Sequence, residues 1–199
     1  MFLTSIYMDF WNFTLTLKNH DPELRVDWNV ISSVFLQEAK DVLGFDEPLV
    51  LQDFNVIGSY TQSDADKELR KWVSSYLPKV KGMKTNFTER RRKKSGPRCP
   101  GCHAQIDVCP ICKGSMIGTE EKRNDTLVAV NMIQDAWFKK INAAVLISAD
   151  EDFIPAVKFL NDLGIKVIHA QFAPYGHHLS NACWGRFDIF KTLDRIKRK

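Results

Sequence analysis

The sequence lacks any long uninterrupted apolar run. None of its 199 residues lies in a stretch near the roughly 20 apolar residues that a membrane-spanning helix needs. The first residues carry no basic region before their short hydrophobic stretch, and Asp9 interrupts that stretch early, so a secretory signal is not expected. We therefore expect a protein without a membrane partner that is located in the cytoplasm.

Cysteines and glycine motifs are also scarce. The five cysteines are an odd number, and four of them lie between residues 99 and 112, which favours metal ligation in a reducing compartment over a disulfide framework. No G-x-G-x-x-G follows any expected strand, which argues against a Rossmann-type cofactor enzyme. The chain shows no internal repeat, so its length and 44% hydrophobic content predict one principal domain with a small insertion.

Basic residues are concentrated in one segment. The formal net charge is +4, but residues 84–98 alone carry seven basic side chains against Glu89. Such a block is typical of polyanion binding, because each Lys or Arg that neutralises a phosphate releases counterions, although a solvated loop is the alternative. The residues that we expect to hold a nucleic-acid backbone are Arg90, Arg91, Arg92, Lys93 and Lys94.

The hydrophobic pattern alternates between strand-like and helical segments. Strands are expected at residues 3–8, 49–57, 83–88, 143–148 and 166–172. Helices are expected at 27–40, 65–77, from about 120 onwards, at 152–163 and near the C-terminus, where the last helix begins at Ser180 and carries Cys183 as a buried small hydrophobe. This alternation predicts an α/β fold, a three-layer sandwich with a mainly parallel sheet covered by helices on both faces.

Aspartates follow two of the expected strands. Asp9 comes after 3–8 and Asp150 after 143–148, and ligands of parallel sheets bind beyond the carboxyl ends of the strands. Asp152 begins a helix at the same edge, where it is also a natural N-cap. Asp125 lies in the first turn of the helix that precedes the strand at 143–148, a position that the helix dipole favours for an acid. Clustered carboxylates repel one another unless a cation neutralises them, and Mg²⁺ or Mn²⁺ suits such oxygen ligands.

A divalent cation at this edge could activate water for attack on a phosphodiester. The acidic edge and the basic segment would then serve one substrate, a nucleic acid. A phosphohydrolase that uses Asp150 as a nucleophile is another possibility, but it leaves the basic segment without a role.

Four stretches of the chain resemble, in order, the motifs of NYN domains in the bacterial branch of the PIN-like nuclease superfamily: YMDFWNF, EKRNDTLVAV, LISADEDFIPAV and GHHLSNACWGRFDIF. The resemblance covers residues 1–88 and 119–199. It implies a PIN-like fold and a metal-dependent endoribonuclease acting on RNA. The implied catalytic residues are Asp9, Asn12, Asp125, Asp150 and Asp152; the four aspartates would hold Mg²⁺ or Mn²⁺, and Ser180 and Lys122 would contact substrate.

The chain departs from the family pattern at several positions. Arg123-Asn124 stands where Gly-Val is common, Asn131 stands where an acidic residue is common, and SADEDF replaces SGDSDF. The missing acid at position 131 weakens the case for two metals. One-metal catalysis and a catalytically degenerate RNA-binding or adaptor module both stay open.

The cysteine segment CPGCHAQIDVCPIC contains two C-x-x-C pairs separated by six residues. Two such turns can complete a tetrahedral Zn²⁺ site, formed here by Cys99, Cys102, Cys109 and Cys112. A site closed by four thiolates has a structural role, and the redox alternative requires a strand-to-helix junction that this segment lacks. We therefore predict a basic and zinc-binding insertion at 89–118. The sequence leaves open whether it holds RNA, a protein partner or a second copy in a homo-oligomer.

Overall fold

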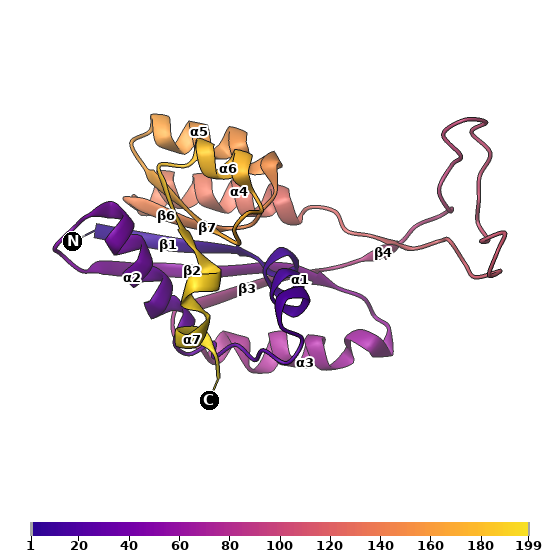
Figure 1. Cartoon of the computed structure of the whole chain (residues 1–199), viewed down its shortest axis with the longest axis horizontal. Helices are drawn as coiled ribbons and strands as arrows, with labels where there is room; N and C mark the ends of the chain where they lie inside the picture. The colour runs from indigo at the N-terminus through magenta and orange to yellow at the C-terminus, as the bar shows by residue number, and fades with distance from the viewer. Residues whose placement is uncertain (1, 199) are drawn as a thin grey trace.

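The computed structural model describes residues 2–198, and its centre is a parallel β-sheet (Figure 1). Six strands lie in the order β3-β2-β1-β6-β7-β8, and every neighbouring pair is parallel. The predicted α/β class with a mainly parallel sheet is therefore confirmed. The strands are β1 (Phe2–Asp9), β2 (Leu49–Tyr60), β3 (Met83–Glu89), β6 (Ala143–Ile147), β7 (Lys166–Gln171) and β8 (Gly185–Asp188).

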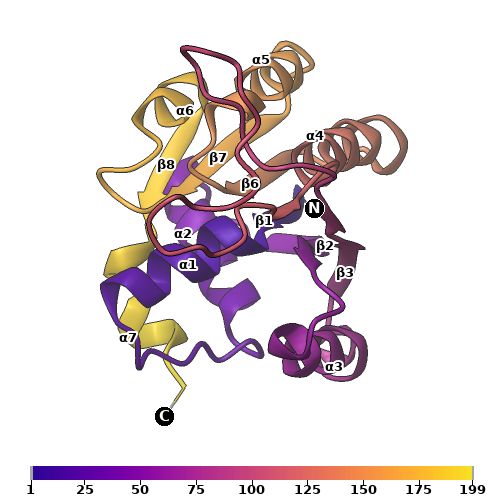
Figure 2. The ribbon, with the colours of Figure 1, turned by 90° about the vertical axis from the view of Figure 1, so that its right-hand side faces the viewer.

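Helices cover both faces of the sheet, as Figures 1 and 2 show. One face carries α1 (Phe10–His20), α2 (Ile31–Leu43), α3 (Lys67–Ser75) and α7 (Leu193–Ile196). The other face carries α4 (Asn124–Gln134), α5 (Ile154–Asp162) and α6 (His177–Ala182). Each face has its own hydrophobic cluster, so the molecule has three layers. Within residues 2–198, no helix combines the length and the apolar character that crossing a membrane requires.

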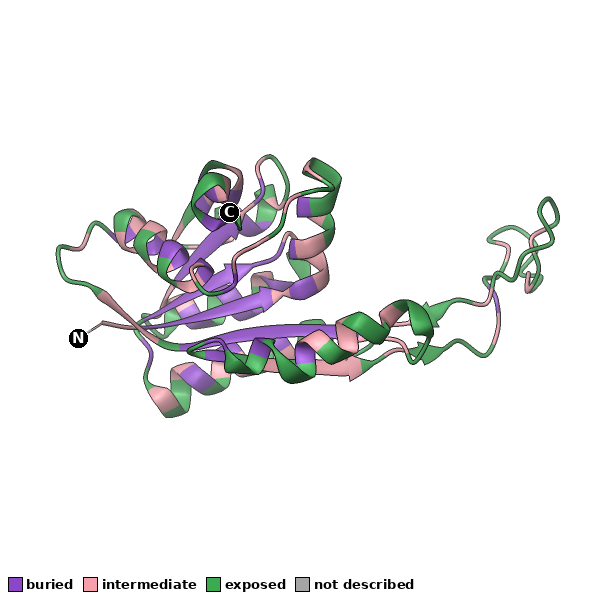
Figure 3. Ribbon diagram, turned by 90° about the horizontal axis from the view of Figure 1, so that it is seen from below, coloured by how far each residue is buried: buried purple, intermediate pink, exposed green. Residues whose placement is uncertain are grey.

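Short helical turns connect the main elements. They are the 3₁₀ turns η1 (Asp64–Asp66), η2 (Leu77–Lys79), η4 (Glu151–Phe153) and η5 (Ile189–Thr192) and the π-helical turn η3 (Asp135–Lys139). Figure 3 shows that the burial is concentrated in the sheet. All five residues of β6 are buried, as expected for a central parallel strand whose two faces are both covered. In β1, Ile6 and Met8 pack into one hydrophobic cluster while Tyr7 packs into the other.

The structure differs from the predicted elements in three regions: the start of α2, the elements α1 and β8, and the helix near Ser180. The helix expected from residue 27 begins at Ile31, because the Asp27 carboxylate accepts a hydrogen bond from the backbone N–H of Asn29 at 3.0 Å and forms a turn there. Helix α1 and strand β8 were not predicted. Ser180 lies within α6, which begins at His177, and the last helix is α7. Cys183 follows the end of α6 and is half-buried.

A long arm leaves the sheet at the carboxyl end of β3 (Figures 1 and 3). Its stem is a two-stranded antiparallel ladder of β4 (Arg91–Arg92) and β5 (Thr119–Glu120). The segment predicted as an insertion, 89–118, runs from the end of β3 through the arm and stops just before β5. The arm therefore starts and ends at the edge of the sheet where β1 and β6 end.

Candidate active site

Asp9 is the last residue of β1 and the N-cap of α1. Its Oδ1 accepts hydrogen bonds from the backbone N–H groups of Trp11 at 3.1 Å and Asn12 at 3.2 Å. Burial raises the pKa of Asp9 to about 6 despite these hydrogen bonds, and the charges of Asp125 and Glu121 raise it further. The carboxylate of Asp9 is therefore held in place and lies near other anions.

Asp150 and Asp152 lie in the turn after β6. The Oδ1 of Asp150 accepts a hydrogen bond from the backbone N–H of Asp152 at 2.9 Å, and the backbone N–H of Asp150 donates to Ser148 Oγ at 3.2 Å. Asp150 is therefore the N-cap of η4, and the expectation that Asp152 caps a helix here is wrong. The side chain of Asp152 is exposed to solvent.

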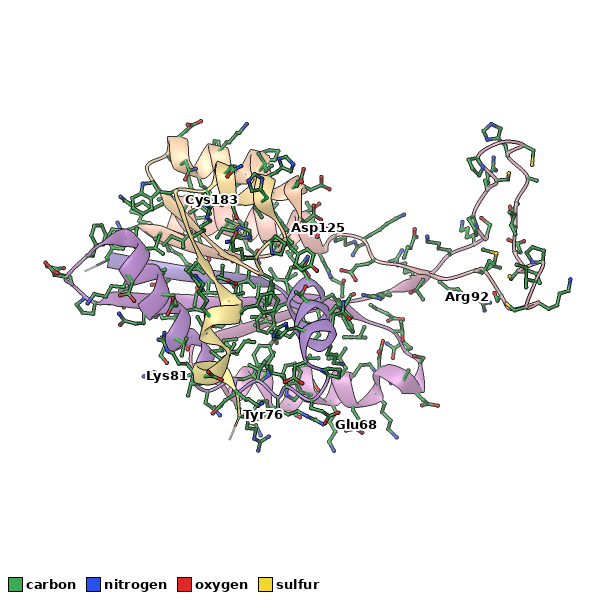
Figure 4. All side chains as sticks on the ribbon, viewed as in Figure 1. Glu68, Tyr76, Lys81, Arg92, Asp125 and Cys183 are labelled. Carbon is green, nitrogen blue, oxygen red and sulfur yellow. The ribbon has the colours of Figure 1, made fainter. Side chains whose placement is uncertain are left out.

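Asp125, in the first turn of α4, faces the same group of anions. Partial burial raises its pKa, and the charges of Asp150, Glu121 and Asp152 raise it further, in that order. Figure 4 shows Asp125 at the end of α4 nearest the arm. We call Asp9, Glu121, Asp125, Asp150 and Asp152 the carboxylate cluster. Within residues 2–198, no three His, Cys, Asp or Glu side chains lie close enough together to ligate one ion directly.

Glu121 is the member of the cluster that was not predicted. It follows β5, and its carboxylate accepts hydrogen bonds from Arg90 Nη2 at 2.6 Å, from the hydroxyl of Ser59 and from the side-chain amide of Asn124. Arg90 Nε also donates to Ser59 Oγ at 2.7 Å. Its position in the same short segment as Asp125, four residues earlier, was the only sequence signal that could have found it.

Arg90 already forms contacts that a bound phosphate would have to replace. Besides its ion pair with Glu121, its guanidinium lies over the ring of Trp11, 4.9 Å from the ring centroid. The other predicted backbone-binding residues of the arm, Arg91 to Lys94, are exposed on the stem, where Figure 4 labels Arg92. Lys122 is 73% exposed and forms an ion pair with Glu120 at 3.2 Å.

Asn12 and His169 fix the turn that carries Asp150. Asn12 Oδ1 accepts a hydrogen bond from the backbone N–H of Ala149 at 3.1 Å. His169, on β7, donates from Nε2 to the carbonyl of Ser148 at 2.6 Å, and burial lowers its pKa so that the ring stays neutral. The hydroxyl of Ser180 donates to His169 Nδ1 at 2.6 Å, lies 2.6 Å from the side-chain amide of Gln171, and belongs to a residue that is only 4% exposed. Ser180 is therefore placed behind the turn.

Arg123 shows how the chain tolerates one departure from the family pattern. It precedes α4 with a φ of 88°, a left-handed conformation that glycine adopts at little cost. The next residue, Asn124, is buried, and its side chain accepts a hydrogen bond from Thr88 Oγ1 at 3.0 Å. The start of α4 is therefore anchored to β3 even without glycine.

The four arm cysteines form two matching turns. In the first, the backbone N–H of Cys99 donates to the Ala104 carbonyl at 2.9 Å, and in the second that of Cys109 donates to the Gly114 carbonyl at 2.8 Å. Backbone N–H groups also point at the sulfurs of Cys99 and Cys109 and lower the pKa of both thiols. The two turns lie apart within the described chain, so the predicted closed four-cysteine site is not confirmed.

Cys183 differs from the arm cysteines. It packs against the cluster of α4, α5 and α6, and burial raises the pKa of its thiol to about 12. A thiol with such a pKa is inert as a nucleophile at neutral pH.

Comparisons with known proteins agree with this architecture. The family model described as "NYN domain" matches residues 4–189. Among solved structures, the chain is similar to a protein of unknown function from Vibrio parahaemolyticus RIMD 2210633, with 14% identity and a TM-score of 0.58 over 98% of this chain and 96% of that chain. At this identity the similarity concerns the fold alone. No curated protein matches the chain.

Proposed function

Because the chain belongs to the NYN domain family, we propose that it is a divalent-metal-dependent endoribonuclease that hydrolyses RNA phosphodiester bonds at the carboxylate cluster. The observation that carries this proposal is the placement of five carboxylates at one edge of the sheet, near enough to one another that their charges raise the pKa of Asp9 and of Asp125. A folded protein that retains such repulsion gains stability when a cation neutralises it.

The donor set fits Mg²⁺ or Mn²⁺. Magnesium in proteins is usually held by one or two carboxylates and keeps several waters, so it does not need three converging side chains. We assign Asp9, Asp125, Asp150 and Asp152 to hold the ion, some directly and the others through its waters. When bound, the ion would supply a Lewis acid for the phosphate and a water of lowered pKa.

The remaining residues of the site position these groups. Asn12 and His169 hold the turn that carries Asp150. Arg90 pairs with Glu121 at the base of the arm and offsets part of its charge, which leaves the four aspartates to hold the cation. We assign the RNA backbone to Arg91, Arg92, Lys93, Lys94 and Lys122, whose side chains are exposed beside the cluster.

We also propose that one structural Zn²⁺ joins the two cysteine turns of the arm. The lowered pKa of Cys99 and Cys109 favours the thiolate form that zinc requires. The segment 103–108 would bend to bring the two turns together. Closure would make the exposed arm rigid, and the basic stem would then keep one orientation beside the cluster.

An RNA-binding or adaptor module without cleavage is the second candidate. Asn131 in place of the common acid supports it, and so does the finding that no three acidic side chains of residues 2–198 converge on one point. Its partners would be RNA and, through the arm, a protein or a second copy of the chain. The cytoplasm is the compartment that we propose for either candidate.

Cleavage assays with an isosteric variant distinguish the two candidates. End-labelled single-stranded RNA, structured RNA and DNA are incubated with Mg²⁺, Mn²⁺ or EDTA. The variant Asp150→Asn removes one charge and keeps a good N-cap for η4, whereas Asp46→Asn removes an exposed charge from the turn between α2 and β2 as a matched control.

We expect metal-dependent RNA fragments from the wild type and the control, and none from Asp150→Asn, which should still bind RNA at least as tightly as the wild type. Undiminished cleavage by Asp150→Asn would refute the assigned pocket. Salt-sensitive binding without cleavage by any of the three proteins would establish the second candidate.

A further inference from the structure

A groove of about 880 Å³ lies outside the carboxylate cluster, between α1, the segment 24–29 and α3. Five aromatic side chains line it, and none has a role in the proposed reaction. They are Phe10, Trp11, Trp28, Trp72 and Tyr76. All but Tyr76 also belong to or pack on the core of this face, and where the rings reach the surface they offer flat faces to a ligand with stackable groups.

The rings form a continuous series from the floor of the groove to its rim. Phe10 and Trp28 are buried at 5% and 9% exposure and form the floor. The ring of Trp72 packs against both, at centroid distances of 5.9 Å and 5.1 Å. Tyr76 then stacks on Trp72 at 6.2 Å with an interplanar angle of 23° and is 40% exposed. Another planar ring could continue this stack at Tyr76, which Figure 4 labels.

Basic side chains slightly outnumber the acidic ones around these rings. The cations that line the groove are Lys18, Arg25, Lys71 and Arg198, all exposed. Three acids also line it, Asp27, Asp66 and Glu68, so the four cations leave the groove with a net charge of only +1. Asp66 accepts hydrogen bonds from Thr61 at 2.6 Å and 2.7 Å, and Asp27 accepts one from Asn29 at 3.0 Å, which holds both carboxylates in place. Stacking rings within a cationic rim are what single-stranded nucleic acid requires of a binding surface.

Trp11 connects the groove to the carboxylate cluster. Its ring lines the groove, while its Nε1 donates to the backbone carbonyl of Ser59 at 2.8 Å. The hydroxyl of Ser59 in turn donates to Glu121. Trp11 therefore belongs both to the lining of the groove and to the hydrogen-bond network that reaches the cluster.

We propose that this groove is a base-stacking subsite for the single-stranded RNA that flanks the cleaved phosphate, an inference that rests on the proposed function. Stacking accepts every base, so the subsite would select unpaired RNA without selecting its sequence. Bases in a duplex are already stacked on one another and would not enter the groove.

Equilibrium binding in EDTA tests the subsite without any cleavage. The probes are fluorescein-labelled oligouridine, an RNA duplex of the same length and oligothymidine, and binding is followed by fluorescence anisotropy. The variants are Tyr76→Ala, the conservative Tyr76→Phe and Trp137→Ala. Trp137 is a matched control, because it is 66% exposed but lies on η3, next to the helices of the opposite face.

We expect Tyr76→Ala to weaken oligouridine binding about tenfold, the loss of roughly one stacked base. Tyr76→Phe should bind within about twofold of the wild type because it keeps the ring, Trp137→Ala should bind like the wild type, and duplex affinity should be unchanged by all three. Equal oligouridine affinity of Tyr76→Ala and wild type would overturn the subsite. An equal loss for the duplex, or tighter binding of oligothymidine than of oligouridine, would overturn its assignment to single-stranded RNA.

These outcomes are separable from the failure of the proposed function. If the Tyr76 effect on binding is present but no cleavage occurs with any metal, the nuclease proposal fails and the subsite stands. If cleavage occurs but Tyr76→Ala binds oligouridine normally, only the subsite fails.

Discussion

Replacing Asp9 by Asn should stabilise the metal-free protein at pH 8. Folding raises the pKa of this carboxyl from 3.8 to about 6, a difference of about 2 pH units. Each unit corresponds to about 1.4 kcal/mol, so ionised Asp9 lowers the free energy of unfolding by about 3 kcal/mol. Asn carries no charge and is as good an N-cap as Asp, so the hydrogen bonds to Trp11 and Asn12 can persist in the variant.

The sign of the effect fixes its pH dependence. A carboxyl whose pKa is higher in the folded than in the unfolded state contributes stability that is fully present below pH 4 and is lost as the pH rises through 6. The wild type should therefore match Asp9→Asn in stability near pH 4 and fall behind it between pH 4 and pH 7. Saturating Mg²⁺ should reverse the order at pH 8, because binding of the ion to the folded state adds about 4.1 kcal/mol at 1,000 times its dissociation constant, which exceeds the cost of about 3 kcal/mol for ionised Asp9.

Urea unfolding followed by circular dichroism measures these differences. Wild type and Asp9→Asn are compared between pH 4 and pH 8 in EDTA, and again at pH 8 with Mg²⁺. A variant that is less stable than the wild type in EDTA at pH 8, or a stability gap that widens toward pH 4, would refute the electrostatic reasoning. An equal response of both proteins to Mg²⁺ would exclude Asp9 as a residue that holds the ion.

Two further predictions concern the arm and the core. Cys109→Ser should lower the zinc content measured by atomic absorption from one ion per chain to none and speed hydrogen exchange in residues 85–118, while the sheet stays folded; global unfolding would mean that the arm belongs to the core. Tyr7→Phe should lower the free energy of unfolding in urea by about 1.5 to 3 kcal/mol, because the buried Tyr7 hydroxyl donates to Asp135 Oδ2 at 2.7 Å, and an unchanged midpoint would contradict this.

Helices and strands whose apolar residues recur with a clear period could be predicted from the sequence, and short elements could not. The buried run of β6 gave a clear signal. The apolar residues of α4 indicated a helix but not its buried face, because Val130 is 40% exposed while Val128 and Met132 are buried. Strand β8 has only four residues with one buried side chain, Phe187, which is too short for a period. Helix α1 does bury Phe10, Phe13 and Leu17, but its many polar residues and the capping role of Asp9 obscured its start.

A site residue could be predicted only where the order of strands and helices along the chain determines its place. Asp9 and Asp150 reach one edge because their strands are parallel neighbours, and this follows from the order of elements; their roles stay predictions. Glu121 reaches the same edge only because β5 pairs with β4 across the arm, a long-range contact that no local pattern encodes. The same pairing explains why Arg90, expected to face substrate, is engaged by Glu121.

The place of β1 in the sheet has a consequence for synthesis. This strand pairs with β2 on one side and with β6 on the other, yet residues 10–142 separate it from β6. At typical rates of translation, the edge of β1 that faces β6 stays unpaired on the order of ten seconds after β1 itself has been made. An unpaired strand edge is a template for aggregation. The nascent chain therefore passes through a vulnerable period that ends only when residues 143–147 complete the centre of the sheet.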